Sequence, residues 1–151
     1  MSEELKQNIE NQSDKKMNKQ KAEFLIKKFN ARFSIIKYIY QAELFEKNID
    51  VNEIFENEFL DKWQIGTLNN IASKYDALTK LAQKFLNEDW DWNRISPLTR
   101  AIIIYGEYEI LINNPKVVIN EMINMAKIYI PNNDYKIVNK VLDAYAKQIK
   151  K

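Results

Sequence analysis

The scarcity of chain-breaking residues constrains this sequence more than any other feature. Its 151 residues contain only two glycines, Gly66 and Gly106, and three prolines. An all-β domain needs many turns, and turns draw on Gly and Pro as well as Asn and Asp. Asn is plentiful here, but long stretches of the chain contain no breaker. The sequence therefore favours an all-α fold, and its length is that of about one domain.

The spacing of apolar residues predicts about seven helices joined by short loops, as in an all-α bundle. Ser96-Pro97 and Asn114-Pro115 each place a capping residue before a proline, which is favoured at the first position of a helix. The expected helices begin near Asn18, Val51, Trp63, Ser73, Pro97, Pro115 and Asp134. Residues 1–22 are polar and are expected to form a flexible N-terminal extension to a single domain over residues 23–151.

Cysteine and histidine are both absent. Their absence excludes a disulfide framework, zinc sites of the Cys/His kind, and Ser–His or Cys–His nucleophilic pairs. Two glycines are also too few for a Walker loop or a dinucleotide-binding fingerprint. We therefore expect no catalytic residues, no cofactor and no metal site. No apolar run approaches the roughly 18 residues that a membrane span needs, so a cytoplasmic location without a membrane partner is expected.

Charge is unevenly spread, although the formal net charge is only +2. Cations crowd the front of the first long helix, at Lys15, Lys16, Lys19, Lys21, Lys27, Lys28, Arg32 and Lys37. Carboxylates dominate the next stretch, at Glu43, Glu46, Asp50, Glu53, Glu56, Glu58 and Asp61. Such a distribution steers a charged partner to one side of a molecule, although lysines can equally serve only to solvate a helix face.

Four segments, in order along the chain, resemble the NusB family of transcription antitermination factors. They are ARFSIIKYIYQAEL at 31–44, WDWNRISPLTRAIIIYGEYEI at 90–110, VVINEMINMAKIY at 117–129 and KIVNKVLDAY at 136–145. The family's arginine-rich run is thinned here. Its later arginine, acidic residue and glycine are replaced by Ile104, Thr99 and Lys140. These departures bear on partner contacts more than on the fold.

The resemblance implies an all-α fold of two packed helical subdomains, formed by the N-terminal and the C-terminal helices. It also implies pairing with NusE, a ribosomal small-subunit protein that also acts in transcription. The pair would bind single-stranded boxA RNA in ribosomal RNA transcripts and help RNA polymerase read through terminators within an antitermination complex. No catalysis is implied.

The same resemblance suggests which residues would make these contacts. Single-stranded RNA is held by cations along its phosphates and by aromatic rings that stack its bases. The expected RNA-binding residues are Lys27, Lys28, Arg32, Lys37, Lys136 and Lys140. The expected partner interface contains Tyr40, Thr99 and Arg100, although Tyr40 could equally be a core tyrosine. Trp90 and Arg94 are interpreted as a structural brace rather than a stacking site.

A second interpretation remains open because of the thinned arginines. The chain could be a NusB-fold protein-interaction module that has lost RNA binding while keeping the scaffold. Recovery of NusE without RNA would favour that interpretation.

Overall fold

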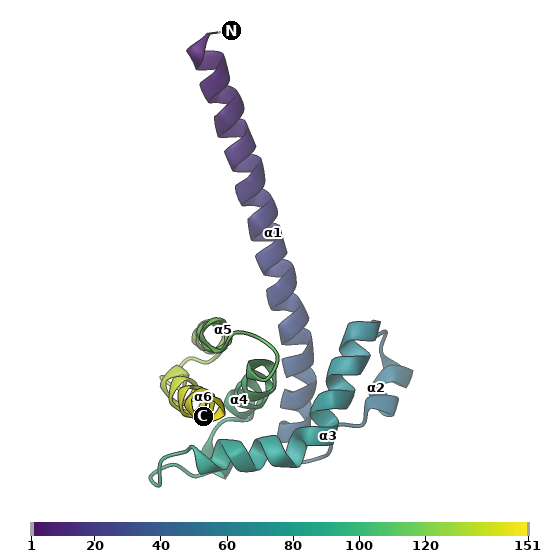
Figure 1. Cartoon of the computed structure of the whole chain (residues 1–151). Coiled ribbons are helices and arrows are strands. Elements are labelled where there is room, and N and C mark those ends of the chain that lie inside the picture. The colour runs from purple at the N-terminus through teal and green to yellow at the C-terminus, as the bar shows by residue number, and fades with distance from the viewer. Residues whose placement is uncertain (1, 151) are drawn as a thin grey trace. The chain divides into compact units, whose positions relative to one another are not determined.

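The computed structural model describes residues 2–150 and contains six α-helices and one short 3-10 turn (Figure 1). The helices are α1 (Glu3–Leu44), α2 (Val51–Asn57), α3 (Lys62–Lys84), α4 (Pro97–Ile110), α5 (Pro115–Tyr129) and α6 (Tyr135–Ile149), and the turn η1 is Trp92–Arg94. No strand occurs among the described residues. The all-α prediction is confirmed, and the helix number is close to the one expected.

The difference in helix number arises at Ser73, where the sequence predicted a boundary between two helices. The structure has one continuous helix there, α3. The hydroxyl of Ser73 donates a 2.8 Å hydrogen bond to the backbone carbonyl of Asn70 in the preceding turn. Because its side chain is satisfied within the helix, serine at this position does not interrupt the backbone ladder.

The first helix begins at Glu3, well before the expected start near Asn18. Ser2 acts at its beginning, because the Ser2 side chain and carbonyl both accept the backbone N–H of Leu5. Glu3 and Glu4 place negative charge in the first turn, where the helix dipole favours it. Every described residue up to Lys28 is exposed. That residues 1–22 form a flexible extension stays a prediction.

The chain divides into two compact units, the first ending at Ser34 and the second beginning at Ile35. The expected boundary at residue 22 therefore falls inside the first unit. The second unit contains the end of α1 and all of α2 to α6. Within it, α4 packs against α3, α5 and α6, as Figure 1 shows. Residues Thr99 to Ile110 of α4 are all buried, so this helix is the centre of the core.

Gly106 allows α4 to approach its neighbours closely. A Cβ atom at this position would lie 2.7 Å from Cδ1 of Leu142 in α6 and 3.1 Å from Cγ of Met122 in α5. Carbon atoms do not approach so closely without displacement, so a Cβ atom here would force the buried Leu142 and Met122 side chains to shift.

No helix among the described residues combines the length and the apolar character that a membrane crossing requires. No group of three or more metal-ligating side chains is gathered among residues 2–150 in a way that could hold a metal ion.

Candidate nucleic-acid interface

An open pocket of about 540 Å³ lies where η1 and the start of α4 meet the start of α6. We name it the Trp90 pocket. Its lining includes Trp90, Arg94, Ser96, Asn132, Asn133 and Lys136. Trp90 is 50% exposed, an unusual state for the largest aromatic side chain. Arg94 and Lys136 are exposed as well. The pocket therefore combines an accessible indole ring, two cations, two amides and the half-buried carboxylate of Asp134.

Local capping shapes the wall of this pocket that precedes α4. Asp91 caps the start of η1, because its carboxylate accepts a 3.0 Å hydrogen bond from the backbone N–H of Asn93. Ser96 caps the start of α4, because its hydroxyl accepts a 3.2 Å hydrogen bond from the backbone N–H of Thr99. Both are ordinary N-cap bonds, so the sequence itself fixes where the chain turns around Trp90 and Arg94.

A hydroxyl–carboxylate contact joins this wall to the opposite one. Thr99 donates a 2.7 Å hydrogen bond from its side chain to Asp134, the residue just before α6. Since Thr99 has one hydroxyl proton, Ser96 must donate in the 2.8 Å contact between the Ser96 and Thr99 hydroxyls. Asp134 makes no side-chain cap to its own helix. Its carboxylate instead fixes the start of α6, and thus Lys136, relative to α4.

Arg100 supports the same turn from inside. Its Nη1 donates to the carbonyl oxygens of Trp92, Asn93 and Ile95, at 3.4, 3.4 and 2.5 Å. Its Nε lies 3.6 Å from Oε1 of Glu43, and both side chains are largely buried. Burial raises the pKa of Glu43, and the positive charge of Arg100 opposes that rise. Arg100 thus holds η1 against α4 and the end of α1.

The predicted partner residues Thr99 and Arg100 are therefore buried and occupied by intramolecular contacts. Tyr40 is half-buried. Binding of a partner at Thr99 or Arg100 would have to act through the turn and the loop that they position. Their membership of an interface stays a prediction.

The predicted RNA-binding cations of α1 fall into different environments. Lys27 and Lys28 are exposed, and Nζ of Lys28 lies 5.8 Å from the centre of the Phe24 ring. Arg32 is buried, with 5% of its surface exposed. A guanidinium buried to this degree does not present its donors to phosphates. The expected strip of Lys27, Lys28 and Arg32 is thus reduced to its two lysines.

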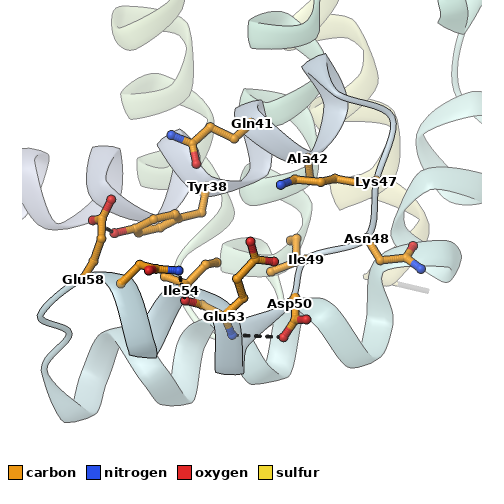
Figure 2. A pocket seen from close by; sticks show the side chains of 11 residues that line it. Tyr38, Gln41, Ala42, Lys47, Asn48, Ile49, Asp50, Glu53, Ile54 and Glu58 are labelled. Atoms are coloured by element: carbon orange, nitrogen blue, oxygen red, sulfur yellow. Dashed lines mark hydrogen bonds between the residues drawn. The ribbon is translucent and has the colours of Figure 1, made fainter.

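Lys37 lies in acidic surroundings. Its Nζ is 3.9 Å from Oε2 of Glu58, and it also lies 5.4 Å from the centre of the Tyr38 ring. Tyr38 donates a short hydrogen bond to the same carboxylate, as Figure 2 shows. Burial, together with this bond and the charge of Glu58, raises the pKa of Tyr38 to about 12. A carboxylate beside Lys37 weakens its attraction for phosphate.

Lys136 and Lys140 are both exposed on α6, four residues apart and therefore on one helix face. Lys136 also lines the Trp90 pocket, whereas Lys140 does not. The structure thus brings Lys136 together with Trp90 and Arg94, which the sequence interpretation had set aside as a brace. Exposure of Trp90 is the property that the sequence could not supply.

Sequence reasoning also missed Glu107, which lies in the middle of α4. Its side chain is fully buried, and neither carboxylate oxygen has a hydrogen-bond partner among the described residues. Burial raises its pKa to about 9. The available signal was one acidic residue within the otherwise apolar run AIIIYGEYEI.

The similarity of this chain to known proteins agrees with the family resemblance that its four segments indicate. The NusB family model matches residues 2–147. The transcription antitermination protein NusB of Bartonella quintana is 32% identical over 115 residues, which span 74% of this chain and 72% of the relative. The protein of the same name from Helicobacter pylori strain Shi470 is 31% identical over 117 residues, spanning 76% of this chain and 78% of the relative.

Proposed function

Because the chain belongs to the NusB family of transcription antitermination factors, we propose that it binds single-stranded RNA of the boxA type together with NusE. In this proposal the pair acts within an antitermination complex of RNA polymerase on ribosomal RNA transcripts, which would place the protein in the cytoplasm. The role requires no catalytic step, in keeping with a family of non-enzymatic factors.

The Trp90 pocket is the observation that carries this proposal. Bases of single-stranded RNA stack on exposed aromatic rings, and their phosphates are held by nearby cations. Trp90 offers such a ring, and Arg94 and Lys136 offer cations in the same pocket. Arg94 also has a planar guanidinium, which suits both phosphate contact and stacking.

Other exposed cations extend the proposed contact. Lys140 shares a helix face with Lys136, so it would meet the next phosphate outside the pocket. Lys27 and Lys28 supply a second pair of exposed cations on α1. Arg32 is left out because it is buried. Asn132 and Asn133 carry amides that can pair with base edges.

The test is a titration of fluorescently labelled boxA-type RNA, read by anisotropy, at several salt concentrations and with or without NusE. We expect the affinity to fall by roughly 0.7 log units per log unit of salt for each phosphate neutralised. Trp90→Ala should lower the affinity by about 5-fold to 150-fold, because stacking on one ring is worth roughly 1–3 kcal/mol. No binding by the wild-type protein under any of these conditions would refute the proposal.

Two observations favour the second interpretation, a protein-interaction module without RNA binding. Arg32 is buried, and Lys37 is next to Glu58. Two of the six predicted RNA contacts are thereby weakened. An affinity pull-down in which NusE is recovered, combined with RNA titrations that show no binding, would establish this alternative.

A further inference from the structure

A stretch of α1 has no buried residue, although it carries both charge and large apolar side chains. We name residues 14–28 the basic helix segment. Six lysines and two acidic residues give it a net charge of +4. Its large apolar side chains are about 60% exposed, at Met17, Phe24, Leu25 and Ile26. Helices in proteins owe most of their stability to packing of an apolar face, so this segment lacks the contact that would normally stabilise it.

One face of the segment combines the two properties. Met17, Lys21 and Phe24 line a single surface hollow of about 510 Å³. Lys28 follows on the same face, with its ammonium group above the Phe24 ring. A partner for this face must therefore offer apolar, preferably aromatic, surface next to carboxylates.

A second stretch of the chain offers those groups. We name residues 53–63, at α2 and the start of α3, the acidic–aromatic segment. Phe55 is 55% exposed, Phe59 99% and Trp63 46%. Together with Asp50, which caps α2, residues 50–63 carry five acidic residues and one lysine, a net charge of −4. This charge is equal and opposite to that of the basic helix segment.

A small hollow beside the acidic–aromatic segment can receive a cationic side chain. It has a volume of about 150 Å³, and the charged side chains of its lining are the three carboxylates Asp50, Glu53 and Glu58 and one cation, Lys47. In Figure 2 the Glu53 carboxylate reaches from α2 into this space, while its backbone N–H donates to Asp50. A lysine ammonium group is a compact cation that fits such a space.

We propose that the basic helix segment of one molecule docks on the acidic–aromatic segment of a second copy of this chain. Lysines face the carboxylates around the hollow, and Met17 and Phe24 pack on the exposed aromatic rings. Both halves of the contact belong to the same sequence, and each leaves apolar surface in water. A reciprocal exchange of the two segments gives a closed dimer, in which both helices become covered.

The experiment measures molar mass by sedimentation equilibrium of the full chain over a range of concentrations. One variant reverses charge on the helix, Lys19→Glu with Lys21→Glu. A second reverses charge on the partner segment, Glu53→Lys with Glu56→Lys. A matched control carries Lys74→Glu with Lys80→Glu, which are exposed lysines of α3 outside both segments. Circular dichroism verifies that each variant remains helical.

We expect the wild-type protein and the control to dimerise equally. Each charge-reversed variant alone should dimerise at least tenfold more weakly. An equimolar mixture of the two variants should regain dimers, because the heterodimer contains one contact between unmutated segments, with charges of +4 and −4. At its second contact the introduced glutamates face the introduced lysines. Dimers of the wild-type protein should also weaken between 0.05 and 0.5 M salt, because the Debye length shortens from about 14 Å to about 4 Å over that range.

Three results would overturn the proposal. They are a wild-type protein that stays monomeric at every concentration, dimers that charge reversal leaves intact, and a mixture of variants that stays monomeric. Lys27, Lys28 and the Trp90 pocket are unchanged in all variants. RNA titration of the Glu53→Lys, Glu56→Lys variant, in which the dimer contact is weakened and Lys27 and Lys28 stay uncovered, therefore tests the proposed function independently of this contact.

Discussion

The Thr99 hydroxyl donates a 2.7 Å hydrogen bond to the Asp134 carboxylate, joining two residues that are 35 positions apart. Thr99 is fully buried, and Ser96 completes the chain of hydroxyl contacts on its other side. This contact holds the loop before α6 against the start of α4. The two walls of the Trp90 pocket are therefore coupled through one side chain.

Replacement of Thr99 by valine tests this coupling. Thr99→Val keeps the shape of the side chain and removes the hydroxyl, which leaves the Asp134 carboxylate without its donor. We expect the free energy of unfolding to fall by about 1–3 kcal/mol, the usual range for a bond to a charged group. Urea denaturation measures the change. In a double-mutant cycle with Asp134→Asn, additive losses would show that the two residues do not interact.

We expect replacement of Arg100 to lower stability more than replacement of Thr99. Arg100→Leu removes the donors to four carbonyl oxygens and leaves the largely buried Glu43 carboxylate without its cation. We expect a loss of about 3–5 kcal/mol in stability, as when one partner of a buried ion pair is deleted. Thermal denaturation provides the measurement. Arg94→Leu, an exposed arginine of the same turn, is the control and should change stability by less than about 0.5 kcal/mol.

Because Glu107 is buried, we expect the free energy of unfolding to decrease as the pH rises. Its pKa is about 9 in the folded protein, above its ordinary value of 4.5. Below pH 4.5 the carboxyl is protonated in both states and its contribution to stability is complete. Between pH 4.5 and about pH 9 only the folded state keeps the proton on Glu107. The free energy of unfolding therefore falls by up to about 1.4 kcal/mol per pH unit, and the contribution of Glu107 is fully lost above about pH 9.

Glu107→Gln should flatten this profile, since an amide does not titrate. Unfolding by urea at pH 5, 6, 7 and 8 gives the comparison, and Glu88→Gln, an exposed carboxylate, serves as the control. The prediction fails when the wild-type protein and Glu107→Gln show the same dependence on pH.

We expect replacement of Lys136 to change how strongly RNA binding depends on salt concentration. Lys136→Gln removes one cation from the Trp90 pocket, so the slope of log affinity against log salt should become shallower by about 0.7. Lys147→Gln changes an exposed lysine near the other end of α6 and should leave the slope unchanged. If Lys136→Gln and Lys147→Gln give the same slope of log affinity against log salt, Lys136 does not contact a phosphate.

Much of the fold could be predicted from the sequence because its signals are local. Ser96-Pro97 and Asn114-Pro115 begin helices as expected, since capping and the fixed φ of proline depend only on neighbouring residues. The boundary at Ser73 was wrong because a serine within a helix can bond to its own backbone. The start at Glu3 was missed because polar composition does not prevent a helix.

The candidate site was less predictable because burial depends on distant packing. Lys136 and Trp90 are 46 positions apart, and no local pattern shows that they share a pocket. Burial of Arg32 and of Glu107 likewise arises from the fold rather than from neighbouring residues. The family resemblance marked Thr99 and Arg100 as important, and the structure gives both of them a positioning role.

The uninterrupted burial of α4 bears on how a nucleic acid would be accommodated. A helix enclosed along twelve successive residues cannot tilt or slide without displacing three neighbours at once. The rim formed at its leading end is accordingly stiff. In the proposed RNA complex, the nucleotide strand would therefore have to adapt its shape to this rim and would bear most of the entropy cost of ordering.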